Sequence, residues 1–189
     1  MARQERILIV GGVAGGASCA ARARRLSESP EIIMFERGPY VSFANCGLPY
    51  HVGNVIKKED HLLIATPELF HHRFRIDVRL NSEVVRIDPV ARTAEIRDLR
   101  QGRTYTESYD KLLLSPGARP IRPDLPGIDL PGIFVLRTIP DSRRIREALD
   151  GATHAVVVGG GFIGLEMTEN LVRRGLHVTV VELAGQLLP

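Results

Sequence analysis

The sequence predicts an α/β fold that contains two copies of a strand, a glycine-rich turn, a helix and a second strand. In the first copy, the apolar run Arg6–Val10 leads into the turn at 11–16, and Glu36 ends the next apolar run. In the second copy, His154–Val158 leads into the turn at 159–164. An apolar run that ends in glycines and opens a helix is typical of parallel strands with crossover helices. The chain has 189 residues, of which 44% are hydrophobic, so it can build one core or two small ones.

The first glycine-rich turn predicts a dinucleotide site. Glycines let the backbone approach a pyrophosphate, and the N-terminus of the helix predicted over Ala17–Leu26 favours its negative charge. Glu36 ends the strand Glu31–Phe35 and is placed to accept hydrogen bonds from a ribose. The middle glycine of the usual pattern is Val13, so this turn alone leaves the identity of the ligand open. The turn residues expected at the cofactor are Gly11, Val13, Ala14, Gly15 and Gly16.

The second turn carries the complete G-x-G-x-x-G pattern. The helix predicted over Leu165–Arg174 is followed by a strand, His177–Val181, that ends at Glu182. Glu182 favours NADH over NADPH, because a carboxylate repels the extra phosphate of NADPH. Two dinucleotide sites in one chain indicate a relay between two cofactors, and a flavin with a nicotinamide is the most economical pair. The glycines of the pattern are Gly159, Gly161 and Gly164.

The region between the two turns predicts a helix, further strands and a crossing between domains. Thr66 and Pro67 have the sequence of a helix N-cap and first turn, so a helix is predicted over Glu68–Arg75. The proline-rich run from Pro120 to Pro131 marks the crossing. The strands are predicted at Asp77–Leu80, Glu83–Asp88, Thr93–Leu99, Thr104–Ser108 and Ile133–Leu136, with a buried strand at Lys111–Leu114 and a helix at Asp141–Leu149.

Cys46 stands at the start of a predicted short helix. Pro49 suits the first helical turn, so Cys46 lies just before a helix N-terminus, where the dipole favours a thiolate. The thiolate is the reactive form of cysteine. The alternative is that Cys46 is a small buried and inert residue, as we expect for Cys19 on the first helix. Two cysteines without a secretory signal argue against a disulfide scaffold and leave reactive-thiol chemistry open.

Together these features resemble the FAD- and NAD(P)-dependent pyridine nucleotide-disulfide oxidoreductases, and within them the single-cysteine branch of coenzyme A disulfide reductases. The resemblance covers the whole chain and is carried by the two turns, Glu36, the segment Ser42–Tyr50 with the sequence SFANCGLPY, and Leu112–Gly117. The larger branch of the family has two redox cysteines separated by four residues. The upstream position is Val41 here, so the partner of Cys46 comes from outside the chain.

The resemblance implies a relay that ends at sulfur. Reduced nicotinamide passes hydride to FAD, and the flavin reduces the sulfur bonded to Cys46. The freed thiolate attacks a disulfide or persulfide, and the next hydride resolves the mixed disulfide. Coenzyme A is the implied outside partner, and Ser42 and Asn45 are implied to form hydrogen bonds near the sulfur.

The resemblance also implies a basic site for the anionic adenosine end of coenzyme A. Arg22 and Arg25 lie about one helical turn apart and would bind it. The family commonly has a lysine at the position of Phe74, and the flanking Arg73 or Arg75 would replace it. The alternative is that the run Arg22, Arg24 and Arg25 forms a solvated helix face.

Further cofactor contacts follow from the resemblance alone. Glu166 matches a helix glutamate behind the nicotinamide, but the lysine that partners it in the two-cysteine enzymes is Tyr50 here. The partner of Glu166 is therefore open, and the alternative is an acid in the first helical turn. The remaining implied cofactor residues are Arg37, Val85, Ser115, Pro116, Gly117, Phe162 and Ile163.

The resemblance also predicts how the chain is organised. The fold expected is two Rossmann-like dinucleotide-binding units of the three-layer ββα/βα type, the second incomplete. Residues 1–118 are assigned to the FAD-binding domain with the redox cysteine, 119–150 to the crossing, and 151–189 to the first βαβ of the NAD(P)-binding domain. Family chains are much longer, so we expect an N-terminal fragment, inactive alone, of a parent that forms homodimers.

Two other functions stay open. NADH oxidases and peroxidases use the same single cysteine as a sulfenic acid, but they usually carry a histidine where this chain has Ala14. The other candidate is a non-catalytic nucleotide-binding module.

The composition argues against several partners. A net charge of +3 spread along the chain fits small anionic ligands better than nucleic acid. No apolar run approaches the roughly 20 residues of a membrane span, so we expect a cytoplasmic protein without a membrane partner. The adjacent His71 and His72 point to different helix faces, so no metal site is expected.

Overall fold

The computed structural model describes residues 3–188, which form two compact units. The first unit comprises Met1–Phe43 and Leu63–Ala118, and the second comprises Ala44–Leu62 and Arg119–Pro189. This grouping differs from the predicted boundary, which kept residues 44–62 with the first domain. The reason is that Val52 in this segment is fully buried in the core of the second unit. The assignment of flavin and nicotinamide to the two regions stays a prediction.

A four-stranded parallel sheet in the order β3-β2-β1-β7 forms the centre of the first unit. Strand β1 (Arg6–Val10) lies between β2 (Glu31–Glu36) and β7 (Lys111–Leu114), and β3 (Ile76–Leu80) pairs with the far side of β2. The middle residues of β1 and β2 are almost completely buried, as expected for parallel strands covered on both faces.

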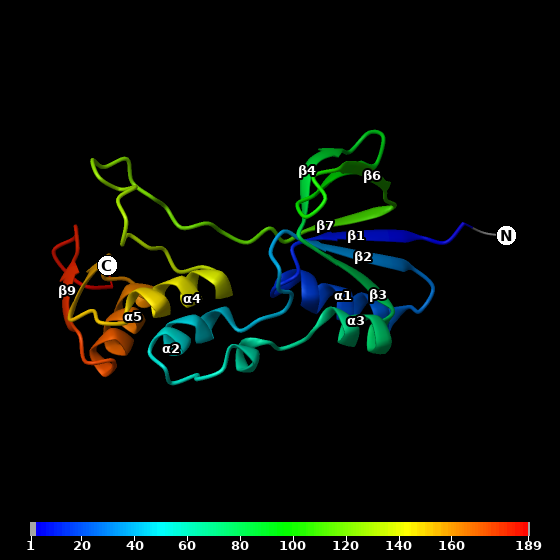
Figure 1. Ribbon diagram of the computed structural model, residues 1–189. Helices are drawn as coiled ribbons and strands as arrows, with labels where there is room; N and C mark the ends of the chain where they lie inside the picture. The colour runs from blue at the N-terminus through cyan, green and yellow to red at the C-terminus, as the bar shows by residue number, and fades with distance from the viewer. Residues whose placement is uncertain (1–2, 189) are drawn as a thin grey trace. The chain divides into compact units, whose positions relative to one another are not determined.

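Different layers cover the two faces of this sheet, as Figure 1 shows. Helices α1 (Gly15–Leu26) and α3 (Pro67–Phe74) pack on one face through a core that includes Ile9 and Met34. A three-stranded antiparallel sheet packs on the other face, against Leu8 and Phe35. These three layers confirm the predicted α/β class with a parallel sheet. The antiparallel strands are β4 (Ser82–Asp88), β5 (Thr93–Asp98) and β6 (Thr104–Ser108).

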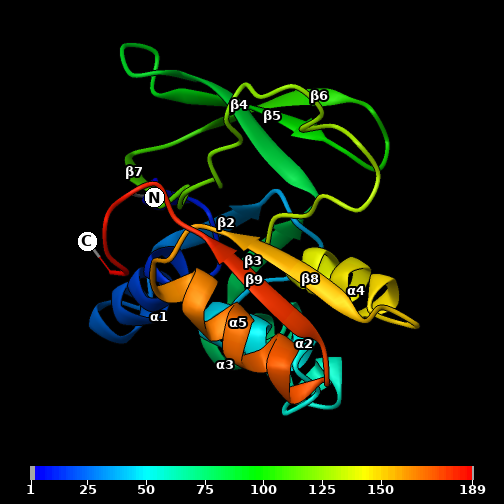
Figure 2. The same ribbon diagram turned by 90° about the vertical axis from the view of Figure 1, so that its left-hand side faces the viewer.

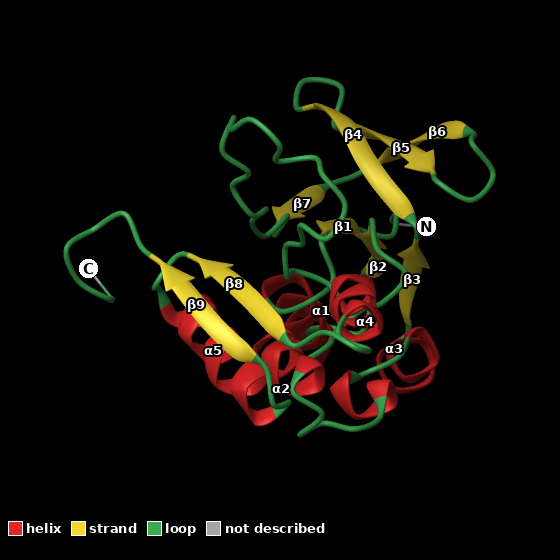
Figure 3. Ribbon diagram, turned by 60° about the vertical axis from the view of Figure 1, so that its left-hand side comes forward, coloured by secondary structure: helices red, strands yellow, loops and turns green. Residues whose placement is uncertain are grey.

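The second unit contains two parallel strands, β8 (His154–Val158) and β9 (His177–Val181), with α5 (Phe162–Arg173) on one face (Figures 2 and 3). Helices α2 (Leu48–Val52) and α4 (Ile139–Ala148) contribute to the same core. The other face of the two strands is open, and its largest apolar side chains are Val156, Val158 and Val181, which are 65%, 78% and 50% exposed. Two 3-10 helices, η1 (Asn45–Gly47) and η2 (Glu59–Leu62), complete this unit.

Side-chain caps fix the start of two helices. The Thr66 hydroxyl accepts a hydrogen bond from the Leu69 backbone at 3.3 Å, which confirms the predicted N-cap of α3. Helix α4 begins at Ile139, two residues before the predicted start, because Thr138 and Asp141 form a capping box.

Two predictions about strands are wrong. Residues 133–136 form no strand, since no strand within residues 3–188 pairs with them, and Leu136 packs on the core of the second unit instead. Strand β7 is not buried: Lys111 and Leu114 are exposed, because β7 is the edge of the sheet in the described part of the chain. No helix among the described residues is both long and apolar enough to cross a membrane.

Candidate functional site

The first glycine-rich turn joins β1, α1 and the end of β7. Gly11 has a φ of +91°, and a Cβ there would overlap the carbonyl oxygen of Ser115. A Cβ on Gly16 would overlap the carbonyl oxygen of Gly11, so the start of α1 lies this close to the end of β1 only because residue 16 is glycine. The Ser115 backbone donates to Val10 at 2.8 Å. The predicted turn residues therefore lie beside Ser115, which opens the run through Pro116 and Gly117.

Glu36 holds this turn through its carboxylate. One oxygen accepts from the Gly12 backbone at 2.9 Å and the other from Gly38 at 2.8 Å. Each carboxylate oxygen has a second lone pair, so the group can still accept hydrogen bonds from a ribose. Arg37 lies beside Glu36 with its side chain 72% exposed, 3.6 Å from Glu83.

Val85 lies where the register between β4 and β5 shifts, and it is 38% exposed. Its role in binding a cofactor stays a prediction.

The second turn repeats this arrangement. Gly159 has a φ of +104°, and a Cβ on Gly164 would overlap the Gly159 carbonyl oxygen. Glu182 accepts from the backbones of Ala184 at 2.8 Å and Gly160 at 2.6 Å, and these hydrogen bonds lower the pKa of its carboxyl group.

The start of α5 follows directly from this turn. Gly161 is the residue that precedes the helix, and Phe162 and Ile163 in its first turn are 77% and 60% exposed. Helix α5 begins earlier than predicted, so Glu166 lies beyond the first turn and the alternative of a first-turn acid is wrong. The backbone oxygen of Glu166 accepts from the Asn170 side chain at 2.8 Å.

Cys46 is exposed in η1, directly before α2. This exposure is opposite to the alternative of a buried, inert cysteine, whereas Cys19 on α1 is half-buried. Ser42 is buried with a φ of +47°, and Asn45 begins η1. The Ala44 backbone donates to Leu62 at 2.8 Å, which fixes the start of the segment to its end. Reduction of the sulfur bonded to Cys46 by the flavin stays a prediction.

A buried histidine anchors the short helix that follows Cys46. The Nδ1 atom of His51 lies 3.0 Å from the hydroxyl of Ser142 on α4, and this hydroxyl donates to the Ile139 backbone at 2.8 Å. His51 therefore acts as the donor in this contact. Burial, and then the positive charge of Arg146, lower the pKa of His51.

The arginines of α1 divide into two groups. Arg24 is buried and donates to the backbone oxygens of Phe74 at 2.7 Å and Glu28 at 2.8 Å, so the alternative of a solvated face is wrong for this residue. Arg22 and Arg25 are exposed, and the Arg25 guanidinium lies 5.9 Å from the centre of the Phe74 ring.

The two candidates to replace the family lysine also differ. The Arg73 guanidinium lies 5.6 Å from the centre of the Phe74 ring, the same ring that the Arg25 guanidinium approaches. Arg75 instead forms an ion pair with Glu28 at 2.7 Å. Arg73 is therefore the better candidate for a cation beside Arg25.

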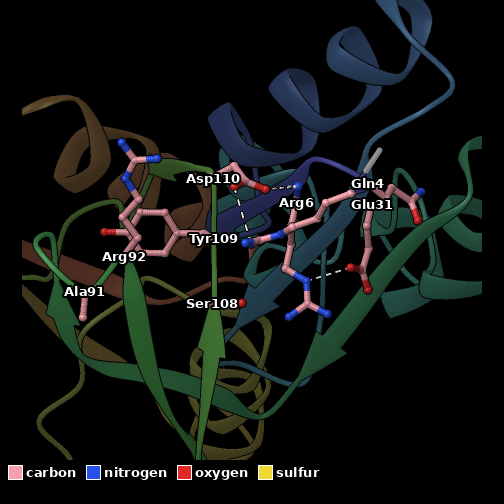
Figure 4. A pocket seen from close by; sticks show the side chains of 9 residues that line it. Gln4, Arg6, Glu31, Ala91, Arg92, Ser108, Tyr109 and Asp110 are labelled. Atoms are coloured by element: carbon pink, nitrogen blue, oxygen red, sulfur yellow. Dashed lines mark hydrogen bonds and ion pairs between the residues drawn. The ribbon is translucent and has the colours of Figure 1, made fainter. Parts of the chain in front are cut away.

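Figure 4 shows a hollow of about 500 Å³ in the first unit, which is lined by residues that include Arg6, Glu31 and Tyr109. Arg6 and Glu31 in its lining begin β1 and β2, whereas dinucleotides bind at the carboxyl ends of parallel strands. Four of the five charged residues in its lining form ion pairs: Arg6 pairs with Glu31 at 2.7 Å, and Arg3 with Asp110 at 3.5 Å. We interpret it as a structural charge network. In the described residues, no three His, Cys, Asp or Glu side chains gather in a way that could hold a metal ion.

The comparisons with known proteins agree with this geometry. The family model described as pyridine nucleotide-disulphide oxidoreductase matches residues 5–189. The chain belongs to this family. It is 42% identical over 178 residues to a coenzyme A disulfide reductase of Staphylococcus haemolyticus, covering 93% of this chain and 40% of that protein. The chain thus spans less than half the length of this curated relative.

Solved structures of the family share the fold. The reduced CoADR-RHD of Bacillus anthracis superposes with a TM-score of 0.96 and 53% identity, over 99% of this chain and 34% of that one. An NAD-dependent persulfide reductase from A. fulgidus superposes with a TM-score of 0.93 and 34% identity, over 97% of this chain and 35% of that one. A water-forming NADH oxidase from Lactobacillus brevis superposes with a TM-score of 0.93 and 28% identity, over 98% of this chain and 41% of that one. The family uses FAD and NAD(P)H.

Proposed function

We propose that this chain supplies the two cofactor turns and the redox cysteine of a flavin-dependent reductase of small disulfides or persulfides, with coenzyme A disulfide as the first candidate. The observation that carries the proposal is the exposed Cys46 in a chain with two glycine-rich turns of the same geometry. An exposed thiol can meet a substrate from solution.

The first turn fits the pyrophosphate and ribose of FAD, and the second fits those of NADH. In each turn, glycines bring the helix start close to the strand, and an acid with free lone pairs stands at the end of the next strand. FAD, when bound, would carry two electrons from NADH to sulfur. Glu182 favours NADH over NADPH, because its carboxylate would repel the extra phosphate of NADPH.

Cys46 forms and breaks the bonds to sulfur. Its thiolate attacks one sulfur of the substrate disulfide, the S–S bond breaks, and one thiolate leaves with the electron pair. The mixed disulfide on Cys46 then takes up two electrons and releases the second thiol. Ser42 and Asn45, which flank Cys46 in the sequence, are assigned to hydrogen bonds near the sulfur.

The basic patch around Phe74 supports coenzyme A as the substrate. Arg25 and Arg73 lie over the same ring, and Arg22 is exposed one turn before Arg25 on α1. Guanidinium groups bind phosphates and stack on aromatic rings, so this patch fits a phosphorylated adenosine. Arg75 is less suited than predicted, because Glu28 already pairs with it.

Within the proposal, a persulfide is the second candidate substrate after coenzyme A disulfide. Two other functions are the outcomes to be distinguished. An NADH oxidase or peroxidase would use Cys46 as a sulfenic acid, and Ala14 argues against it. A non-catalytic nucleotide-binding module would bind cofactors without electron transfer. We place the parent protein in the cytoplasm as a homodimer.

A single-turnover experiment tests the proposal. The test uses the full-length parent, because we expect this chain to be inactive alone. The parent is loaded with FAD, Cys46 is converted to a mixed disulfide with coenzyme A, and NADH is added without oxygen. We expect bleaching of the flavin absorbance and release of one equivalent of coenzyme A. Cys46→Ser should bind FAD but release no coenzyme A, and Cys19→Ser should behave as the unmodified protein. Equal release with Cys46→Ser, or flavin that NADH does not bleach, would contradict the proposal.

A further inference from the structure

We infer that residues 183–188 form a clamp that holds the second glycine-rich turn in its dinucleotide-binding shape, with Leu187 and Leu188 as positioning residues. The inference rests on the proposed nicotinamide site and adds to it two residues that the motifs of the sequence do not mark.

Gly160, the second residue of the second turn, is held at three points. Its backbone N–H donates to Glu182 at 2.6 Å, and its carbonyl oxygen accepts from the Leu188 backbone at 3.1 Å. Its α-carbon is covered by Leu187, so a Cβ at this position would overlap the Leu187 side chain. Both polar groups of Gly160 are therefore bound within the chain, and the turn cannot rotate here without losing a hydrogen bond.

The first turn has the same clamp. The N–H of Gly12 donates to Glu36 at 2.9 Å, and its carbonyl oxygen accepts from the Ser42 backbone at 3.0 Å. A Cβ on Gly12 would lie only 2.8 Å from the side chain of Val41. In each copy, the covering aliphatic residue stands five positions after the acid, and the backbone donor stands six positions after it.

The backbone conformation of the two donors also agrees. Ser42 has a φ of +47° and Leu188 a φ of +51°, a region that residues other than glycine rarely adopt. Such a conformation costs about 1 kcal/mol or more and persists only where the surroundings enforce it. The side chains of the two clamps differ, and so does their burial: Val41 is 2% exposed and Leu187 is 51% exposed. The recurrence is therefore a property of the backbone arrangement and not of one packing environment.

The clamp has a consequence for ligand binding. Because the N–H of Gly160 already donates to Glu182, a pyrophosphate must use the N–H groups that follow Gly160, at the start of α5. The same contact fixes the Glu182 carboxylate, since one of its oxygens is bound to Gly160. A turn that is ordered before the ligand arrives loses less entropy on binding. Weakening the clamp should thus lower dinucleotide affinity although no ligand contact is removed.

Three variants of the clamp test this inference. Leu187→Ala removes the cover of Gly160 and should weaken NADH binding by about tenfold, the cost of ordering about one flexible group. Leu187→Val restores the aliphatic cover seen at Val41 and should recover most of the affinity. Leu183→Ala is the matched control, because Leu183 is fully exposed in the same segment. NADH affinity is measured by fluorescence titration of each chain, with circular dichroism as the check on folding.

Backbone amide exchange of the unliganded chains gives the second readout. In Leu187→Ala, the Gly160 and Leu188 amides should exchange faster, while strand amides of β8 stay protected. Unchanged exchange overturns the clamp itself, whether or not NADH binds. Faster exchange with unchanged NADH affinity overturns its role in binding. If the unmodified chain binds no NADH, both the proposed nicotinamide site and the role of the clamp in binding are wrong. The exchange data still decide whether the clamp exists.

Discussion

The two glycine-rich copies in this chain have the same local structure in very different surroundings. In the first copy, β1 and β2 have neighbours on both sides and covered faces, and Leu8, Ile9 and Ile33 are 0% exposed. In the second copy, β8 and β9 pair only with each other among the described strands, and one face is open. The turns, the acids and the clamps nevertheless agree. Local sequence therefore encodes the turn, whereas burial of the strands depends on what packs around them.

Alanine in place of the last glycine of each turn should have the largest effect and should separate the two copies. In Gly16→Ala, the new methyl group meets the Gly11 carbonyl within a packed core. We expect the unfolding free energy to fall by about 3 kcal/mol, after alanine regains about 1 kcal/mol of helix propensity. Gly164→Ala should cost less, because the open surroundings of the second turn can relax. Urea unfolding measures both, with Gly185→Ala as the control, since a Cβ there meets nothing within 4 Å. Equal costs would show that the surroundings do not matter.

Loss of a charge network in the first unit should give the next largest fall in the unfolding free energy. Glu107 on β6 binds Arg6 on β1 at 2.7 Å and Arg79 on β3 at 2.6 Å, so it joins the two sheets. Burial opposes the charge of Arg79, but its hydrogen bonds to Glu107 and neighbouring groups outweigh this and raise the pKa of Arg79. Glu107→Gln leaves one guanidinium facing an amide N–H₂, and we expect a loss of about 2 kcal/mol.

Glu31→Gln is the control for this network. Within residues 3–188, the Glu31 side chain pairs only with Arg6, and it is 42% exposed, so the loss should stay below about 1 kcal/mol. If both variants cost the same in urea unfolding, the link between the two sheets contributes nothing specific.

The smallest expected effect concerns pH and the second unit. Burial lowers the pKa of His51 below its unfolded value of about 6.5, aided by Arg146 and Arg143 and opposed by Glu59. The unfolded state then binds the proton more readily, so this contribution to stability is present at neutral pH and is lost as the pH falls below about 6.5. Urea midpoints at pH 7.5 and pH 5 should differ less in His51→Asn, which keeps a donor toward Ser142. His72→Asn, which changes an exposed histidine, is the control. An unchanged pH difference in His51→Asn would exclude His51 as its source.

The sequence predicted most elements of the fold because strong local signals mark them. The strands at Arg6–Val10, His154–Val158 and His177–Val181 begin and end as predicted, since an apolar run is followed directly by a turn or an acid. The strand at Ile133–Leu136 failed, because strand formation depends on a neighbour that the local sequence does not reveal.

The candidate site was predicted less completely than the fold. The turns and their acids follow from glycine spacing, but the role of Arg24 depends on backbone oxygens about 50 residues away in the chain. The clamps were missed because Val41 and Leu187 carry no chemical motif. The two copies share an equal spacing from the acid to an aliphatic residue, but only the structure shows that this residue covers Gly12 or Gly160.

Assigning one dinucleotide to each turn is the most direct test of the account. The affinities for FAD and for NADH are both measured for three proteins: the unmodified chain, Glu36→Gln and Glu182→Gln. The account predicts that Glu36→Gln weakens FAD binding and leaves NADH binding unchanged, while Glu182→Gln does the reverse. If one variant weakened both ligands, or if the pattern were exchanged, the two turns would not be the separate flavin and nicotinamide sites that we propose.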